Sequence, residues 1–86
     1  MSWDDVSYIV SSKTRQAIVL KLETPKTPTI LANNLKINLP NISRALAELR
    51  NRKIVVCLTP AQRVGKIYGL TKKGRGAVSS IKAMKQ

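Results

Sequence analysis

The chain has 86 residues, of which 43% are hydrophobic, with one Trp, two Tyr and no Phe. This length and composition predict a single domain, residues 1–86, with a thin core of Leu, Ile, Val and Ala. Sixteen Lys and Arg against four Asp and Glu give a formal charge of +12, which favours a polyanionic partner. The chain has no His and a single cysteine, Cys57, so we expect no enzyme, no cofactor, no metal site and no internal disulfide.

Two short helices are expected at the start of the chain. The first is predicted by apolar residues at helical spacing: Trp3, Val6, Ile9 and Val10. Ser11 and Ser12 offer an N-cap for the second helix, residues 13–23. The core stripe of this second helix is Ile18, Val19 and Leu22. Residues 24–28 contain two prolines and end it, because proline cannot continue a helix.

The next two predicted helices are joined by a tight turn at residues 36–38. The first of them begins at Thr27 or Pro28. Its buried side and the core beneath the turn are assigned to apolar residues: Ile30, Leu31, Leu35 and Ile37. Asn38 is the predicted N-cap of the second helix, which spans about residues 39–51. The inward face of that helix follows a helical period: Ile42, Ala45, Leu46 and Leu49.

Two strands around a basic loop are expected next. Residues 54–59 are β-branched and apolar and predict the first strand, in which Cys57 is expected to be a small buried hydrophobe. Residues 60–65 form the loop and residues 66–70 the second strand. Thr71 then caps a final helix with an apolar stripe: Ala77, Val78, Ile81 and Met84. The order predicts an α+β, mainly α fold: a winged helix-turn-helix with a three-helix core, a two-stranded β-wing and short N- and C-terminal helices.

The positive charge is concentrated in the second half of the chain. Residues 36–76 carry ten basic residues and one acidic residue, whereas residues 1–35 carry four and three. A recognition helix enters the DNA major groove by its N-terminal part. We expect residues 39–51 to do so, with Asn41, Ser43 and Arg44 reading bases. Asn can pair with adenine, and Arg with guanine, in bidentate fashion.

Other residues are expected to contact the DNA backbone. The candidates for such contacts are Thr27, Thr29, Lys36 and Pro40. The basic wing, about residues 59–66, is expected to place Arg63 and Lys66 in the minor groove or along the backbone. Glu48 either accepts a hydrogen bond from cytosine or stands clear of the groove and pairs with Arg44 or Arg52. We prefer the second interpretation.

Three stretches of the sequence carry a resemblance to a known family. The first is Pro28-Thr29-Ile30-Leu31-Ala32, with Leu35, Ile42-Ser43-Arg44-Ala45-Leu46 and Leu49. The second is Cys57-Leu58-Thr59-Pro60, with Gly65-Lys66-Ile67-Tyr68-Gly69-Leu70-Thr71-Lys72-Lys73-Gly74. The third is the opening Trp3-Asp4-Asp5-Val6. Together they resemble winged helix-turn-helix regulators of the MarR/ArsR type, and the opening is similar to a small archaeal subgroup.

The resemblance covers almost the whole chain and implies a sequence-specific double-stranded DNA-binding transcriptional regulator, commonly a homodimer. Two departures qualify what it implies. Metal-sensing members need clusters of Cys, His and carboxylates, which this sequence lacks. MarR-type members use long terminal helices for dimerisation and for an effector pocket, whereas the terminal helices predicted here are short.

Several alternatives stay open at this point. The terminal apolar residues Trp3, Val6, Ile81 and Met84 form either a dimer surface or part of a monomeric core. The function is either that of a DNA-binding regulator, of an RNA-binding or ribosome-associated protein, or of a protein-interaction module. No apolar run approaches the roughly 20 residues of a membrane span, and the N-terminus does not resemble a signal peptide. We therefore expect a cytoplasmic protein with no membrane partner.

Overall fold

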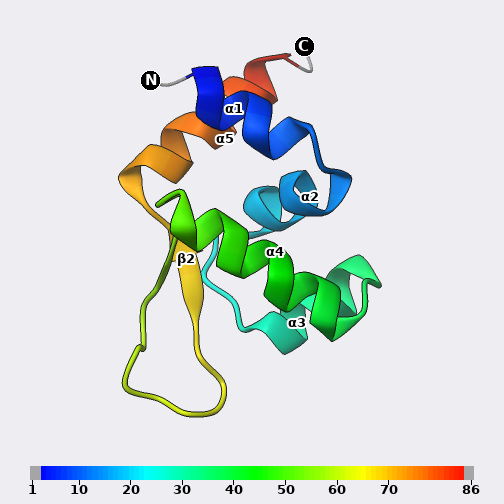
Figure 1. The fold of residues 1–86 in the computed structure, drawn as a ribbon, viewed down its shortest axis with the longest axis vertical. Helices are drawn as coiled ribbons and strands as arrows, with labels where there is room; N and C mark the ends of the chain where they lie inside the picture. Colours follow the sequence, from blue (N-terminus) through cyan, green and yellow to red (C-terminus); the bar gives the residue numbers. More distant parts are fainter. Residues whose placement is uncertain (1–2, 85–86) are drawn as a thin grey trace.

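Five helices and a two-stranded antiparallel sheet make up the fold in a computed structural model, which describes residues 3–84 (Figure 1). The helices are α1 Trp3–Val10, α2 Lys13–Lys21, α3 Pro28–Leu35, α4 Leu39–Asn51 and α5 Lys72–Met84. The strands are β1 Val55–Cys57 and β2 Tyr68–Leu70. All five predicted helices are present, although α2 ends at Lys21 and not at the expected residue 23. Both predicted strands are present but shorter than the expected residues 54–59 and 66–70.

The helix starts follow from side chains that satisfy the first unpaired backbone N–H groups. A side-chain oxygen accepts a hydrogen bond from the N–H three residues later, at 2.9–3.2 Å, in four residues: Ser12, Thr27, Asn38 and Thr71. The predicted caps are therefore confirmed. Pro28 and Pro40 lie in the first turns of α3 and α4, where a backbone N–H would have no partner within the helix.

An aliphatic core lies between the helices and the sheet. Its largest fully buried side chains are Val6, Ile9, Ile18, Val19, Leu22, Leu31, Ile42, Leu49, Ile54, Val55 and Ile81. The predicted inward face of α4 is confirmed, since all four of its residues are buried. One predicted core residue is wrong: Ile30 is 46% exposed, because it lies on the outer side of α3. Met84 continues the apolar stripe of α5 but is 53% exposed, because it lies in the last turn of the helix, beyond the buried Ile81.

The four terminal apolar residues were left open between a dimer surface and a monomeric core, and two of them belong to the core. Val6 is 0% exposed and Ile81 is 1% exposed. They are buried because α1 and α5 pack against each other and against α2, which completes the core within one chain. Trp3, at 65% exposure, and Met84 remain on the surface at this end of the molecule.

A residue in the left-handed conformation keeps the turn between α3 and α4 short. Lys36 has a φ of 56°, and its N–H donates to the Ala32 carbonyl. The N–H of Ile37 donates to the same carbonyl at 3.2 Å. These two hydrogen bonds give the Ala32 carbonyl, in the last turn of α3, backbone donors at the end of the helix. Ile37 packs beneath the turn, partly buried against the core, as predicted.

The sheet gains a third segment that the sequence did not reveal. β1 pairs with β2 in the register Val55↔Leu70 to Cys57↔Tyr68. On the other side of β2, Tyr68 exchanges two backbone hydrogen bonds with Lys26, at 2.9 and 3.0 Å. β1 ends early and β2 begins late because the Ile67 N–H donates at 2.9 Å to the side-chain hydroxyl of Thr59 and not to a backbone carbonyl of the opposite strand. Cys57 is only half-buried, so its predicted burial is wrong.

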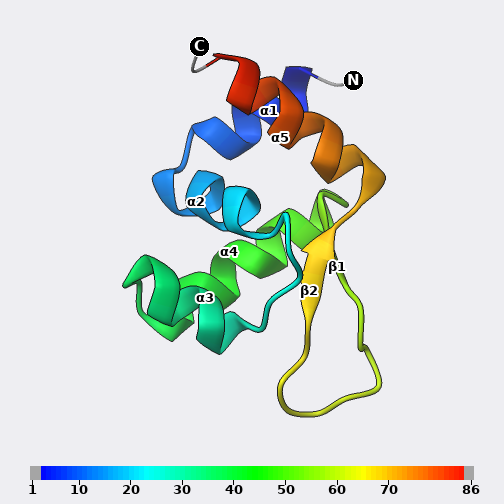
Figure 2. The same ribbon diagram turned by 180° about the vertical axis from the view of Figure 1, so that it is seen from behind.

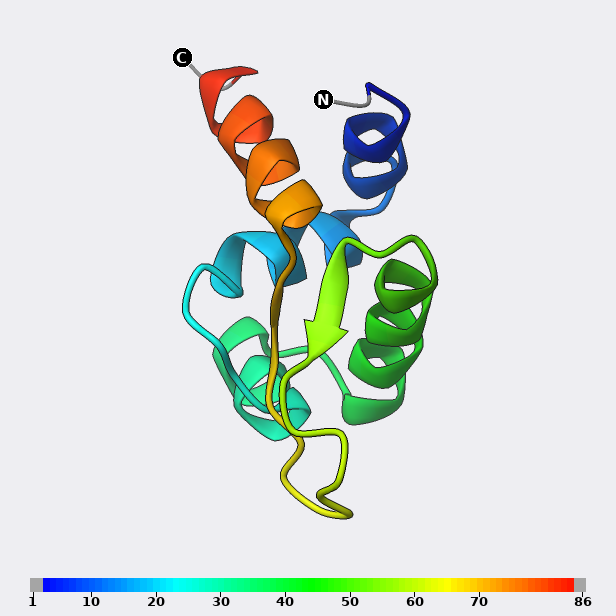
Figure 3. The same cartoon turned by 90° about the vertical axis from the view of Figure 1, so that its left-hand side faces the viewer.

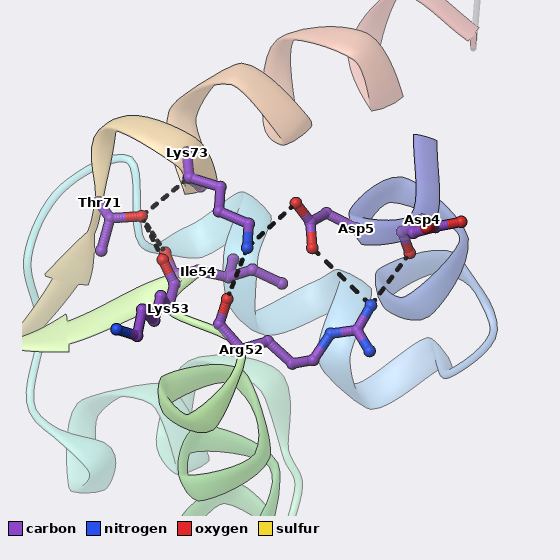
Figure 4. Close-up of polar contacts among 8 residues, drawn as sticks. Asp4, Asp5, Arg52, Lys53, Ile54, Thr71 and Lys73 are labelled. Atoms are coloured by element: carbon purple, nitrogen blue, oxygen red, sulfur yellow. Dashed lines mark hydrogen bonds and ion pairs between the residues drawn. The ribbon is translucent and has the colours of Figure 1, made fainter. Parts of the chain in front are cut away.

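The junction between β2 and α5 is fixed by Thr71 (Figure 4). Its hydroxyl approaches the carbonyls of Lys53 at 2.7 Å and Ile54 at 3.1 Å, and its N–H donates to the Ile54 carbonyl at 3.0 Å. The first turn of α5 then passes so close to Ile54, the residue before β1, that a Cβ on Gly74 would lie 2.2 Å from the Ile54 oxygen. Glycine at position 74 therefore permits the close approach of the helix to the strand.

The elements divide between two ends of a molecule measuring 36 × 25 × 19 Å. α3, the start of α4 and the wing loop, residues 58–67 between β1 and β2, lie at one end, and α1 and α5 lie at the other (Figures 1 and 2). Figure 3 shows β1 beside α4, with the wing loop extending beyond the helices. This is a winged helix-turn-helix fold. No helix within residues 3–84 is long and apolar enough to cross a lipid bilayer.

Candidate nucleic-acid interface

The exposed face of α4 carries the residues predicted to read bases. Residues three or four positions apart form an outer ridge opposite the buried stripe, and all of them are exposed: Pro40, Arg44, Ala47 and Asn51. Asn41 and Ser43 are also exposed and lie on the two flanks of this ridge. The N-terminal half of α4 thus presents amide, hydroxyl and guanidinium groups to solvent.

A groove separates α4 from the wing loop. This wing groove has a volume of about 390 Å³, and its lining residues come from α3 and its N-cap, α4, the wing loop and the first residue of β2. Five of the predicted DNA-contacting residues line it: Thr27, Thr29, Ser43, Arg63 and Lys66. The structure therefore brings together residues that are up to 39 positions apart in the sequence, from Thr27 to Lys66.

The other flank of α4 borders a second hollow, of about 280 Å³. Asn41 and Arg44 line it together with Glu48 and two residues at the start of α2, Ser12 and Thr14. The residues predicted to read bases are thus divided between the two flanks, with Ser43 on the wing side. Lys36 lies apart from both hollows, at the turn between α3 and α4.

The helix starts at this end leave few free backbone donors. In α3 and α4 the first turns contain proline, and the caps Thr27 and Asn38 take the next N–H groups. The N–H groups of Thr29 and Leu39 have no acceptor within their helices. Thr27 accepts through its oxygen, so its hydroxyl proton is still available to donate. These groups are suited to contacts with phosphate oxygens.

Most of the acidic residues are engaged by basic ones away from the wing groove. Asp5 is 4% exposed and faces Arg52 at 3.8 Å and Lys73 at 3.4 Å (Figure 4). Glu23 pairs with Lys82. Within residues 3–84, no ion pair is formed by the basic residues at the wing and helix-turn-helix: Lys36, Arg44, Arg63 and Lys66.

The predicted partner of Glu48 is wrong. Its Oε1 atom accepts from Nη1 of Arg15 at 3.1 Å, rather than from Arg44 or Arg52. Arg15 lies on α2, which packs against α4, whereas Arg52 is directed toward α1. The pair joins residues 33 positions apart, so helical spacing within α4 could not reveal it.

Two further exposed residues of the interface were missed from the sequence. Leu39 is 43% exposed and lines the wing groove. Val64 is 84% exposed and lies in the wing loop beside Gly65, which has a φ of +69°. Neither residue was assigned a role from the sequence, because their exposure beside the groove depends on how α4 and the wing loop are placed. No group of His, Cys, Asp and Glu able to hold a metal ion occurs within residues 3–84.

Solved structures share this fold. A MarR family transcription regulator is similar with a TM-score of 0.79 and 24% identity, over 95% of this chain and 56% of that one. The transcriptional repressor CouR, solved bound to a 23-mer DNA duplex, gives 0.75 and 27%, over 94% and 62% of the two chains. An ArsR family transcriptional regulator gives 0.69 and 20%, over 96% and 84%. These likenesses support the winged helix-turn-helix fold found in regulators of the MarR and ArsR families.

The chain also spans only 51–57% of the length of three similar structures of ZitR from Lactococcus lactis. No protein-family model and no curated protein matches the chain. The likeness therefore concerns the winged helix-turn-helix part of these larger proteins.

Proposed function

We propose that the protein is a transcriptional regulator that binds double-stranded DNA sequence-specifically. The observation that carries this proposal is the combination of an exposed face of α4 that bears Asn41, Ser43 and Arg44 with a wing groove lined by two basic residues, Arg63 and Lys66, that form no ion pair within residues 3–84. The polar side chains of α4 can hydrogen-bond base edges, and the basic residues can neutralise phosphates. The DNA duplex bound by the similar repressor CouR supports the same class of ligand.

In the proposed complex, the N-terminal half of α4 enters the major groove. α4 has 13 residues and is about 20 Å long at 1.5 Å per residue, so its first turns can enter while its last turn stays outside. Arg44 would pair with guanine and Asn41 with adenine, each in bidentate fashion. Ser43, on the flank facing the wing, would contact a base or a phosphate.

The DNA backbone would then lie along the two helix starts and the wing groove. Thr27 and Thr29 would donate to phosphate oxygens, and Lys36 would approach the backbone beyond the turn. Pro40 would pack against the sugar-phosphate chain. Arg63 and Lys66 would place the wing loop on the backbone or in the minor groove.

We further propose that the active form is a homodimer. Trp3 and Met84 are exposed at the end of the molecule opposite the wing loop, where α1 and α5 lie side by side (Figure 1). A contact there would leave both recognition helices free for half-sites about one helical turn, ~34 Å, apart. Analytical ultracentrifugation with and without duplex DNA tests this. A monomer at high micromolar concentration in both conditions would contradict it.

The main test compares duplex binding by the wild type with Asn41→Ala and Arg44→Ala, on selected sequences and on random duplexes. Arg75→Ala is the matched control, because Arg75 is an exposed basic residue on α5, away from both α4 hollows. Loss of one base-reading side chain is expected to cost roughly 1–3 kcal/mol on the selected site and much less on random duplexes. The control variant Arg75→Ala is expected to bind the selected site and the random duplexes about as tightly as the wild type.

Other outcomes would reject part or all of the proposal. Equal losses on every sequence would indicate a general nucleic-acid binder without base reading. Absence of duplex binding at low salt would reject DNA as the ligand. Competition with structured RNA at matched salt would then identify an RNA-binding protein.

A further inference from the structure

Glu48 is unusual among the residues of the recognition helix α4. It is the only acidic residue between position 24 and the end of the chain. Its side chain is 41% exposed and lines the same hollow as Asn41 and Arg44. A carboxylate at this place would repel the phosphates of an approaching duplex. The proposed function therefore requires that the charge of Glu48 be balanced or directed away from the duplex.

The charge of Glu48 is balanced by a rigidly held partner, Arg15 of α2. Nη1 of Arg15 lies 3.1 Å from Oε1 of Glu48. Its Nε donates to the Tyr8 carbonyl at 3.0 Å, and its Nη2 donates to the Ser11 hydroxyl at 2.9 Å. The guanidinium also stacks on the Tyr8 ring, with Cζ 4.0 Å from the ring centroid. The Arg15 side chain is only 16% exposed.

These contacts use the guanidinium on several sides and leave little of it for a phosphate. A guanidinium that is held by hydrogen bonds and stacking loses little further entropy when it pairs with a carboxylate. The other close cation of this region, Arg52, stacks on the same Tyr8 ring at 4.3 Å but is directed to Asp5. Arg15 is therefore the partner fixed on Glu48.

We propose that Arg15 is a positioning residue for DNA binding: it neutralises Glu48 and holds that carboxylate on the α2 side of α4, so that the α4 ridge can approach a polyanion. This role rests on the proposed function. In this role Glu48 makes no contact with cytosine. The role also makes α2 part of the electrostatics of the interface, although Arg15 itself touches no DNA.

The test is a double-mutant cycle in duplex binding with Arg15→Ala, Glu48→Gln and the double variant. Arg15→Ala exposes an unbalanced carboxylate and is expected to weaken binding roughly 3- to 10-fold at low salt. Glu48→Gln leaves an unbalanced cation and is expected to tighten binding roughly 3- to 10-fold. The double variant restores the local charge and is expected to bind like the wild type. These effects are the same on selected and random duplexes, and they shrink at high salt because mobile ions screen them.

Two controls separate this role from simple support of the fold. Glu23→Gln removes a carboxylate that is also paired, but with Lys82, and is expected to leave DNA binding unchanged. Arg15→Lys keeps the charge and is expected to bind close to the wild type even if its unfolding midpoint falls. If Arg15→Ala does not fold, the DNA affinities of Arg15→Lys and Glu48→Gln still test whether the charge balance at Glu48 affects binding.

Two results would contradict the positioning role of Arg15, and a different one would contradict the proposed function. A double variant as weak as Arg15→Ala would mean that Arg15 contacts DNA directly. Weaker binding by Glu48→Gln on the selected site alone would mean that Glu48 reads a base. Either result overturns the positioning role while the proposed function stands. Failure of the wild type to bind duplex DNA would overturn the proposed function itself.

Discussion

Three basic side chains at or near the end formed by α1 and α5 face carboxylates, whereas those at the end formed by α3, the start of α4 and the wing loop form no ion pair within residues 3–84. Lys73 and Arg52 both approach the buried Asp5, and Lys82 pairs with Glu23. At the opposite end, Arg63 and Lys66 line the wing groove without an acidic partner within residues 3–84. The same residue types thus hold the fold together at one end and remain available to a ligand at the other.

The difference shows why net charge alone does not locate an interface. Paired surface charges contribute modestly to stability and are screened by salt. Unpaired ones raise the local potential and attract a polyanion. What marks the proposed DNA-binding end is therefore that cations without an acidic partner within residues 3–84, Arg63 and Lys66, line one groove beside α4.

Removing three charges from one end should have the largest effect. Lys36→Ala, Arg63→Ala and Lys66→Ala combined are expected to weaken duplex binding by roughly two to three orders of magnitude near ~0.1 M salt, because each lost phosphate contact forgoes counterion release. The slope of log K against log salt should fall by about 3. The matched variant removes three exposed cations elsewhere: Lys21→Ala, Lys72→Ala and Arg75→Ala. Similar losses in both variants would contradict the comparison.

The joint between α5 and β1 should be the site most sensitive to a single methyl group. Gly74→Ala would place a Cβ 2.2 Å from the Ile54 carbonyl oxygen, so backbone must move. We expect a loss of about 1–3 kcal/mol in the free energy of unfolding, measured in urea. Ser79→Ala, an exposed change on the same helix, is the control. A Gly74→Ala variant as stable as the wild type would show that α5 does not approach β1 so closely.

The buried carboxylate of α1 should matter for stability and not for DNA binding. Asp5→Asn removes the charge that faces Arg52 and Lys73 and is expected to cost about 1–2 kcal/mol in the free energy of unfolding. Duplex affinity measured below the unfolding transition should stay within about twofold of the wild type. Asp4→Asn is the control, since the exposed Asp4 engages Arg52 only through its backbone carbonyl. A large change in affinity for Asp5→Asn would show that the two ends are electrostatically coupled.

The smallest effect on stability is expected at Trp3. Because this side chain is 65% exposed, Trp3→Ser should change the free energy of unfolding by no more than about 0.5 kcal/mol. If the proposed dimer contact is correct, the same change weakens self-association in sedimentation experiments. Thr29→Ser, at the opposite end, is the control. A loss of stability larger than that of Asp5→Asn would mean that Trp3 is part of the core.

Local signals explain how much of the fold the sequence predicted. The caps Ser12, Asn38 and Thr71 and the inward stripe of α4 depend on neighbours within a few residues, and all were predicted correctly. The bridge between Lys26 and Tyr68 and the pair of Arg15 with Glu48 depend on contacts between distant segments. No periodicity within one helix or strand encodes such contacts, so both were missed.

The candidate site also combines features set by neighbouring residues with features set by contacts between distant segments. Exposure of Asn41, Ser43 and Arg44 could be predicted, because the apolar stripe of α4 fixes which side faces outward. Their separation onto two flanks, and the meeting of Ser43 with Arg63 and Lys66 in one groove, required the placement of the wing loop. Burial of Val6 and Ile81 likewise required the packing of α1 against α5.

The single tryptophan of the chain gives the molecule a built-in optical probe. Trp3 is largely in water, at the end opposite the wing loop, so its emission should be that of a hydrated indole (Figure 1). Added duplex should leave the wavelength of this emission unchanged, because α1 lies at the end of the molecule opposite the start of α4 and the wing loop. Burial of the indole between two copies would shift the emission to the blue as protein concentration rises. Intrinsic fluorescence can therefore follow association of the chain with itself separately from its binding to DNA, without a label.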